Sequence, residues 1–177
     1  MLQSVLAAFV LLALVPANFT SGDVRNRDPF ADPPSVPKDV SPVTVITMQR
    51  TECFGTCPVY KLTIFADGRV RYEGSKHVKK KGKAESHISR QKLQELIDEF
   101  ENIYYFNLND AYVRGSKGCP QWVPDMPSAI TSLTRIRDGE RKTVNHYHGC
   151  HGPDVLELLT RLEDKIDDAV NVNQWIK

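Results

Sequence analysis

Hydrophobic and polar positions alternate in two separate parts of the chain, and each alternation is followed by a helical spacing of apolar residues. In the first part, residues 43–48 are dense in β-branched side chains, and residues 59–65 alternate up to the turn pair Asp67-Gly68. Alternation resumes at residues 70–73. This stretch therefore predicts a strand followed by a β-hairpin.

A helix is predicted after this hairpin. Ser89 is a residue type that caps helix N-termini, and the apolar residues after it have the spacing of one helix face. They are Leu93, Leu96, Ile97, Phe100 and Ile103.

The second part repeats this order of elements. Residues 129–137 and 142–148 predict two strands joined at Asp138-Gly139, and Gly152-Pro153 predicts the start of a helix, where proline is tolerated. A strand-hairpin-helix unit used twice predicts an α+β fold, an antiparallel sheet of about four to six strands with two helices packed on one face. The apolar stripe of the second helix is expected to comprise Val155, Leu158, Leu159, Leu162, Ile166 and Val170.

The N-terminal part of the chain has a different pattern. Residues 5–15 form an uncharged apolar run, shorter than the roughly 20 residues that a membrane-spanning helix needs. Such a run is typical of a signal peptide, with cleavage expected after Ala17. Residues 18–42 contain five prolines and few apolar residues, so they predict a disordered tether. The expected organisation is a signal peptide at 1–17, this tether, and a single α+β domain at 43–177.

Export implies a secreted or periplasmic location. No cysteine follows the apolar run closely enough to take a lipid anchor, and no transmembrane span is expected in the mature chain. Composition adds little to this picture. With 23 Lys and Arg against 22 Asp and Glu, the chain has no basic excess to indicate a nucleic-acid partner.

All four cysteines lie in the predicted domain. In an oxidising compartment an even number indicates two disulfides, here with three possible pairings. Cys53 and Cys57 flank a turn in which Gly55 can bring them together, and Cys119 and Cys150 bracket the second hairpin. The pairing Cys53–Cys57 with Cys119–Cys150 is therefore favoured.

The segment from Arg50 to Tyr60 reads RTECFGTCPVY. It resembles a bacterial family of exported domains of unknown function built around the pattern R-x-x-C-x-G-x-C-P-x-Y. Arg50, Gly55, Pro58 and Tyr60 match that pattern beside the two cysteines, and the resemblance extends over most of residues 43–177. It implies an exported α+β domain and supplies no catalytic residues.

A short run near the end of the second hairpin has the chemistry of a metal site. It contains His146, His148, Cys150 and His151. Alternate residues of a strand point to the same face, so the first two imidazoles could reach one Zn or Cu ion, with Cys150 or His151 completing the site. The alternative is that these histidines face solvent and that Cys150 is oxidised.

The expected function is a non-catalytic exported domain that binds a protein or ligand in the cell envelope or outside the cell. No G-x-S-x-G, H-E-x-x-H or glycine-rich phosphate loop is present, so an enzyme is not favoured, and no cofactor is expected. The alternative is a metal-binding or thiol-redox protein. Against a redox role, three residues separate Cys53 from Cys57, and a strand rather than a helix is predicted to follow.

Overall fold

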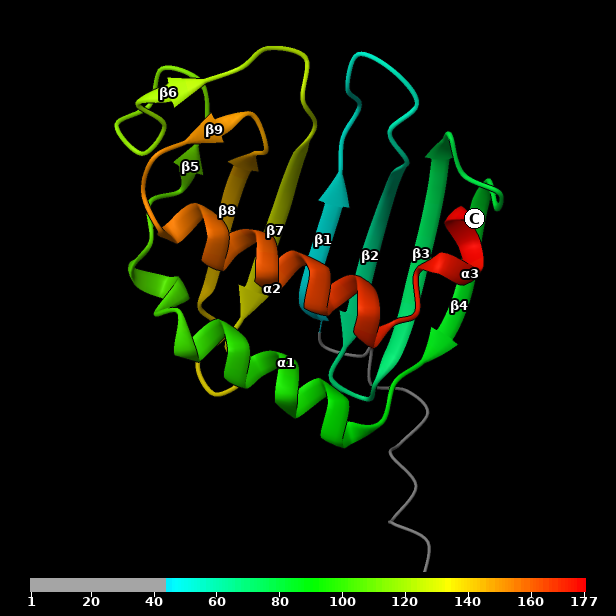
Figure 1. The fold of residues 1–177 in the computed structure, drawn as a ribbon. Helices are drawn as coiled ribbons and strands as arrows, with labels where there is room; N and C mark the ends of the chain where they lie inside the picture. Colours follow the sequence, from blue (N-terminus) through cyan, green and yellow to red (C-terminus); the bar gives the residue numbers. More distant parts are fainter. Residues whose placement is uncertain (1–43) are drawn as a thin grey trace, which may run out of the picture. The chain divides into compact units, whose positions relative to one another are not determined.

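The computed structural model describes residues 44–177, so the predicted signal peptide and tether lie outside the described residues. A seven-stranded sheet forms its centre, in the order β4-β3-β2-β1-β7-β8-β5 (Figure 1). Neighbouring strands are antiparallel, except that β5 pairs in parallel with β8. The strands of this sheet are β1 (Thr44–Arg50), β2 (Val59–Phe65), β3 (Arg69–Lys76), β4 (Gly82–His87), β5 (Ala111–Tyr112), β7 (Ser128–Thr134) and β8 (Arg141–Tyr147).

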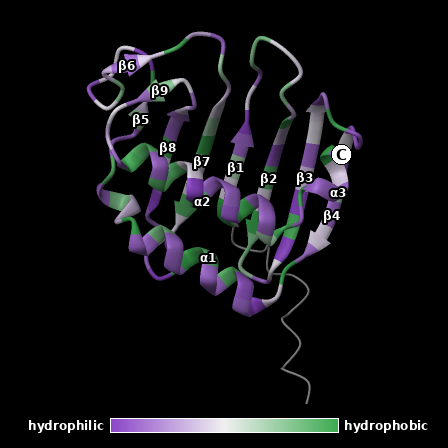
Figure 2. Cartoon of the chain, in the orientation of Figure 1, coloured by the Kyte–Doolittle hydropathy of each residue, from purple (hydrophilic) through white to green (hydrophobic). Residues whose placement is uncertain are grey.

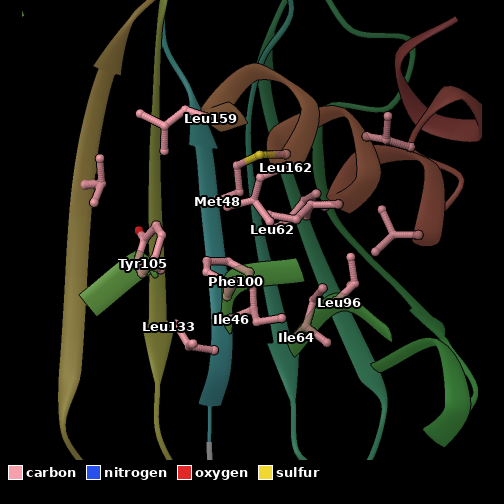
Figure 3. Close-up of a cluster of buried hydrophobic side chains, with 14 of the residues drawn as sticks. Ile46, Met48, Leu62, Ile64, Leu96, Phe100, Tyr105, Leu133, Leu159 and Leu162 are labelled. Atoms are coloured by element: carbon pink, nitrogen blue, oxygen red, sulfur yellow. The ribbon is translucent and has the colours of Figure 1, made fainter. Parts of the chain in front are cut away.

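Two long helices, α1 (Arg90–Asn102) and α2 (Val155–Ala169), lie in front of one face of the sheet in Figure 1. Their apolar side chains meet those of the strands in a single hydrophobic core, part of which is drawn in Figure 3. Figure 2 shows hydrophilic residues along the sides of both helices turned away from the sheet. The core is therefore the layer between the sheet and the two helices.

Shorter elements complete the described chain. The two-residue strands β6 (Gln121–Trp122) and β9 (Cys150–His151) pair with each other beside the main sheet. A 3₁₀ turn, η2 (Tyr105–Asn107), follows α1, and α3 (Asn173–Ile176) ends the chain. Trp175 of α3 stacks on Tyr72 of β3 with ring centroids 4.6 Å apart, which fixes the C-terminal segment to the sheet.

The α+β class is confirmed, but the predicted number of strands is wrong. Two strands account for the excess. The strand β4 is polar and lies at the sheet edge, where lysine and glutamate side chains suit solvent. The strand β5 has only two residues, too few for an alternation to be recognised.

The helix boundaries follow the predicted signals closely. The side chain of Ser89 accepts a hydrogen bond from the Lys92 backbone N–H at 3.1 Å and caps α1 as predicted. By contrast, α2 begins at Val155, two residues after Pro153, and the backbone N–H of Leu156 donates to the carbonyl of Pro153 at the three-residue spacing of a turn. Its buried face also differs from the prediction, with the buried residues being Leu156, Leu159, Leu162, Glu163 and Ile166.

The second hairpin has a longer turn than predicted. The strand β7 ends at Thr134, and the backbone N–H of Arg135 donates to the carbonyl of Glu140 at 2.8 Å. Gly139 within this turn has φ +74°, a conformation that glycine adopts without strain. The two parts of the chain are not equivalent, because four strands precede α1, whereas the long hairpin β7–β8 and the three short strands β5, β6 and β9 lie between α1 and α2.

Two disulfides hold the connecting loops, in the pairing favoured from the sequence. Cys53–Cys57 closes the loop between β1 and β2, with Gly55 at φ +148° inside it. Cys119–Cys150 joins the segment before β6 to β9. Among the helices of residues 44–177, none has the length and apolarity needed to cross a membrane.

Candidate functional site

A row of paired residues crosses four adjacent strands. Tyr60 on β2 pairs with Arg50 on β1, Arg50 pairs with Ala129 on β7, and Ala129 pairs with His146 on β8. Directly paired residues of antiparallel strands point to the same face of the sheet. Since Ala129 is small and fully buried, Arg50 and His146 can both reach the helix α2 above it.

Glu163 of α2 is at the centre of this arrangement and is fully buried. Its Oε1 lies 2.8 Å from Nδ1 of His146, and its Oε2 lies 2.7 Å from Nε2 of His148. Arg50 donates from Nη1 to Oε2 at 3.2 Å. One carboxylate thus holds the guanidinium of β1 and two imidazoles, one within β8 and one just after its end.

Glu163 remains ionised despite its burial. Burial on its own would raise the pKa of this carboxyl, but hydrogen bonds and charge from His146 and His148 outweigh it, so the pKa lies below its ordinary value. An ionised carboxylate only accepts hydrogen bonds. The ring nitrogen that each histidine turns toward Glu163 therefore carries a proton.

Asp167, one turn further along α2, holds the other side of Arg50. Nη2 of Arg50 donates to Oδ2 of Asp167 at 2.9 Å, and the hydroxyl of Tyr60 donates to Oδ1 at 2.7 Å. Burial raises the pKa of Asp167, although Arg50 and Tyr60 oppose this shift. Asp164 also contacts Arg50, at 3.5 Å, and is largely exposed.

Negative charge is in excess around Arg50. Three carboxylates, those of Glu163, Asp164 and Asp167, face one guanidinium. With neutral imidazoles the cluster would carry a formal charge of −2. Asp164 is solvent-exposed, so one of these negative charges, shared by Glu163 and Asp167, is both buried and uncompensated. Since such a charge is costly, this arrangement favours a further positive charge beside the two histidines.

A cleft of about 530 Å³ opens beside the histidines. His146 and His148 line it together with the exposed His151 and Glu157. Within residues 44–177, the second ring nitrogens, Nε2 of His146 and Nδ1 of His148, have no hydrogen-bond partner. The remaining lining residues are Met126, Cys150, Leu156, Thr160 and Arg161.

The structure assembles a different ligand set from the one considered on sequence grounds. His146 and His148 lie together, with ring centroids 4.8 Å apart, and His151 reaches the same cleft. Cys150, however, is bonded to Cys119 and offers no thiolate. Its place beside the imidazoles is taken by Glu163, which was not singled out from the sequence.

The motif residues divide between this cluster and the disulfide loop. Arg50 and Tyr60 both bind Asp167, so they attach α2 to the central strands. Gly55 and Pro58 lie in the loop that follows β1, beside the disulfide. The carboxylates around Arg50 neutralise the guanidinium, which therefore offers no free site for an anion.

A second surface lies where the β1–β2 loop meets the segment between β6 and β7 (Figure 1). Phe54, at the tip of the disulfide loop, is 89% exposed, and its backbone N–H donates to the carbonyl of Asp125 at 3.1 Å. Trp122, Val123 and Met126 are also exposed on the neighbouring segment. We call these four apolar residues, Phe54, Trp122, Val123 and Met126, the loop-end surface.

Comparison with known protein families identifies a match over most of the described chain. The family model described as Domain of unknown function (DUF6438) matches residues 44–170. A search of curated proteins found no match. The expected membership of a domain family of unknown function is confirmed.

Proposed function

We propose that this chain, which belongs to the DUF6438 family of domains of unknown function, is an exported, non-catalytic binding domain stabilised by two disulfides. Its partner is a protein or other ligand of the cell envelope or the extracellular space. The observation that carries the proposal is the concentration of exposed apolar side chains on the loop-end surface.

Exposed apolar residues are unevenly distributed over the described chain. Six large hydrophobic residues are exposed in residues 44–177, and four of them form the loop-end surface. Scattered exposed hydrophobic residues are common, but a grouped set marks a binding surface. Phenylalanine, tryptophan and methionine are also enriched in the centres of protein interfaces. The guanidinium of Arg114, 4.8 Å from the ring centroid of Trp122, adds a polar group at its margin.

The loops that carry this surface are tied to one another. The backbone N–H of Val123 donates to the carbonyl of Gly149 at 2.9 Å, and the hydroxyl of Tyr147 accepts from the backbone N–H of Met126 at 3.2 Å. Each disulfide closes one of the two adjoining segments. Loops held in place before binding lose less entropy on complex formation, which favours affinity.

Export is supported by two independent features. The apolar run at residues 5–15 has the length and composition of a signal peptide core. All four cysteines are paired, and stable disulfides are typical of oxidising compartments. Both features favour a secreted or periplasmic location.

Chemical cross-linking to the envelope and extracellular fractions of the source organism tests the proposed binding surface. We would compare the wild-type protein with Phe54→Ser and with the matched control Tyr104→Ser. Tyr104 is also exposed, at 75%, but lines a separate cleft near the β7–β8 turn. We expect one cross-linked partner to be retained by the wild type and the control and to be reduced at least 10-fold by Phe54→Ser. Equal cross-linking by all three proteins would contradict the proposal.

A further inference from the structure

We infer that His146, His148 and Glu163 form a binding site for a divalent transition-metal ion, with Zn²⁺ the best chemical match. Each residue offers one ligand atom, and these three atoms lie within 4.8 Å of one another. The inference goes beyond the proposed function, because the loop-end surface needs no metal.

The donor set selects the class of metal. Two imidazole nitrogens and one carboxylate oxygen are typical Zn²⁺ ligands, and three protein ligands with an open fourth position are common for this ion. Mg²⁺ and Ca²⁺ prefer oxygen donors, so two imidazoles disfavour them. The cleft of about 530 Å³ beside His146 and His148 provides an entry path and room for a water molecule as fourth ligand.

Metal binding requires local changes in proton positions, in contact lengths and in the placement of Nη1 of Arg50. A histidine nitrogen that ligates a metal must be unprotonated, so the protons now shared with Glu163 must leave or move to the other ring nitrogens. Nε2 of His146 and Nδ1 of His148 can take these protons without losing a hydrogen bond to any residue between 44 and 177. Ligands of a tetrahedral Zn²⁺ lie roughly 3.3 Å apart, so the present contacts of 2.7 and 2.8 Å would lengthen by about half an ångström.

The charge of the cluster provides the independent argument. Glu163, Asp164 and Asp167 exceed the charge of Arg50 by two units when both imidazoles are neutral. One divalent cation would neutralise this excess. Arg50 holds the opposite side of the site: its Nη1 lies 3.2 Å from Oε2 of Glu163 and 3.3 Å from Nε2 of His148, so this nitrogen must move away when a metal binds, while Asp167 keeps Nη2 at 2.9 Å. Protonation of both histidines would give the same net charge, so the two states must be distinguished by experiment.

Calorimetric titration of the mature, disulfide-intact protein with Zn²⁺, after dialysis against a chelator, tests the site. We expect one Zn²⁺ per chain with a micromolar or lower Kd, and no binding of Mg²⁺. Loss of a residue that only supports a metal ligand typically lowers metal affinity by about 10- to 100-fold. Loss of a ligand itself should lower it at least as much, so we expect His148→Ala and Glu163→Gln each to weaken Zn²⁺ binding by about 100-fold or more. The control His77→Asn changes an exposed histidine whose left-handed backbone, φ +52°, asparagine tolerates, and it should bind like the wild type.

Co²⁺ provides a second readout that does not depend on affinity. Bound in place of Zn²⁺, it should give the visible absorption of a tetrahedral site in the wild type and in His77→Asn, but not in His148→Ala. Near-UV circular dichroism establishes that each variant is folded, and His146→Gln replaces His148→Ala if the latter is not. The inference would be overturned if the wild type bound no Zn²⁺, or if the folded histidine variants bound it equally well. Either result would favour the alternative in which both histidines are protonated. The variant Phe54→Ser should retain Zn²⁺ binding, so this result is separate from that of the partner experiment.

Discussion

Arg50 and Tyr60 lie at the two ends of the short motif, and their side chains contact a helix rather than the cysteines between them. They are cross-strand neighbours on β1 and β2, and both bind the side chain of Asp167. Because Asp167 belongs to α2, this contact joins segments more than 100 residues apart. The motif therefore combines a disulfide-closed loop with a polar attachment of α2 to the sheet.

Removing the hydroxyl of Tyr60 tests this attachment. A hydrogen bond to a charged group contributes about 2 kcal/mol, and Tyr60→Phe leaves the buried ring in place. We therefore expect Tyr60→Phe to lower the free energy of unfolding by about 2 kcal/mol, measured by urea denaturation. The control Tyr104→Phe should show no change, since the Tyr104 hydroxyl has no hydrogen-bond partner within residues 44–177. Equal free energies of unfolding for Tyr60→Phe and the wild type would show that the hydrogen bond from Tyr60 to Asp167 does not stabilise the fold.

At the scale of whole elements, the position of α2 over the sheet depends on the small side chain of Ala129. This residue lies between Arg50 and His146 in the paired row and is fully buried. A larger side chain there would occupy the space through which these two residues reach Glu163.

The substitution Ala129→Leu should therefore destabilise the protein by about 2 kcal/mol through overpacking. The matched substitution Ala111→Leu, at a half-buried position on the edge strand β5, should cost less than about 1 kcal/mol, because the added carbons keep access to solvent. Thermal and urea unfolding of both variants measure the difference. Similar losses at the two positions would indicate that the row tolerates a larger residue and that α2 is held elsewhere.

Elements with strong local signals were predictable from the sequence. The first hairpin and the helix α1 follow from Asp67-Gly68 and the cap Ser89, because turns and caps are decided by nearby residues. The two-residue strand β5 carries no such signal. It exists only because β8 is beside it, a contact between distant parts of the chain.

The candidate site was predictable only in part, for the same reason. His146 and His148 were identified because two residues apart on a strand share a face. Glu163 joins them from α2, and nothing local specifies this contact. One signal was available: Glu163 lies four residues after Leu159 and three before Ile166, at the spacing of the buried face. A charged residue at such a position must find partners in the core, and this requirement points to Glu163 as a candidate site residue.

Considered as a whole, the described domain has one disulfide, Cys53–Cys57, in the loop of the loop-end surface, whereas Cys119 and Cys150 are buried and join the hydrophobic core. On the chain-entropy view, the short ring closed by Cys53–Cys57 contributes about 2 kcal/mol, and the larger ring closed by Cys119–Cys150 about 3.5 kcal/mol. Disulfides form and persist mainly in oxidising compartments, so the stability of the folded state depends on where the protein folds.

The intact mass of the mature protein tests this coupling. After alkylation without reduction we expect no label, because all four cysteines are paired, and after reduction we expect four labels. The same mass should correspond to a chain that starts at Asn18, as cleavage after Ala17 predicts. A reduced and alkylated sample that begins at Met1 is the control for an uncleaved chain. Labels before reduction would show that at least one bridge does not form. The larger contribution to stability would be lost if the label were on Cys119 or Cys150.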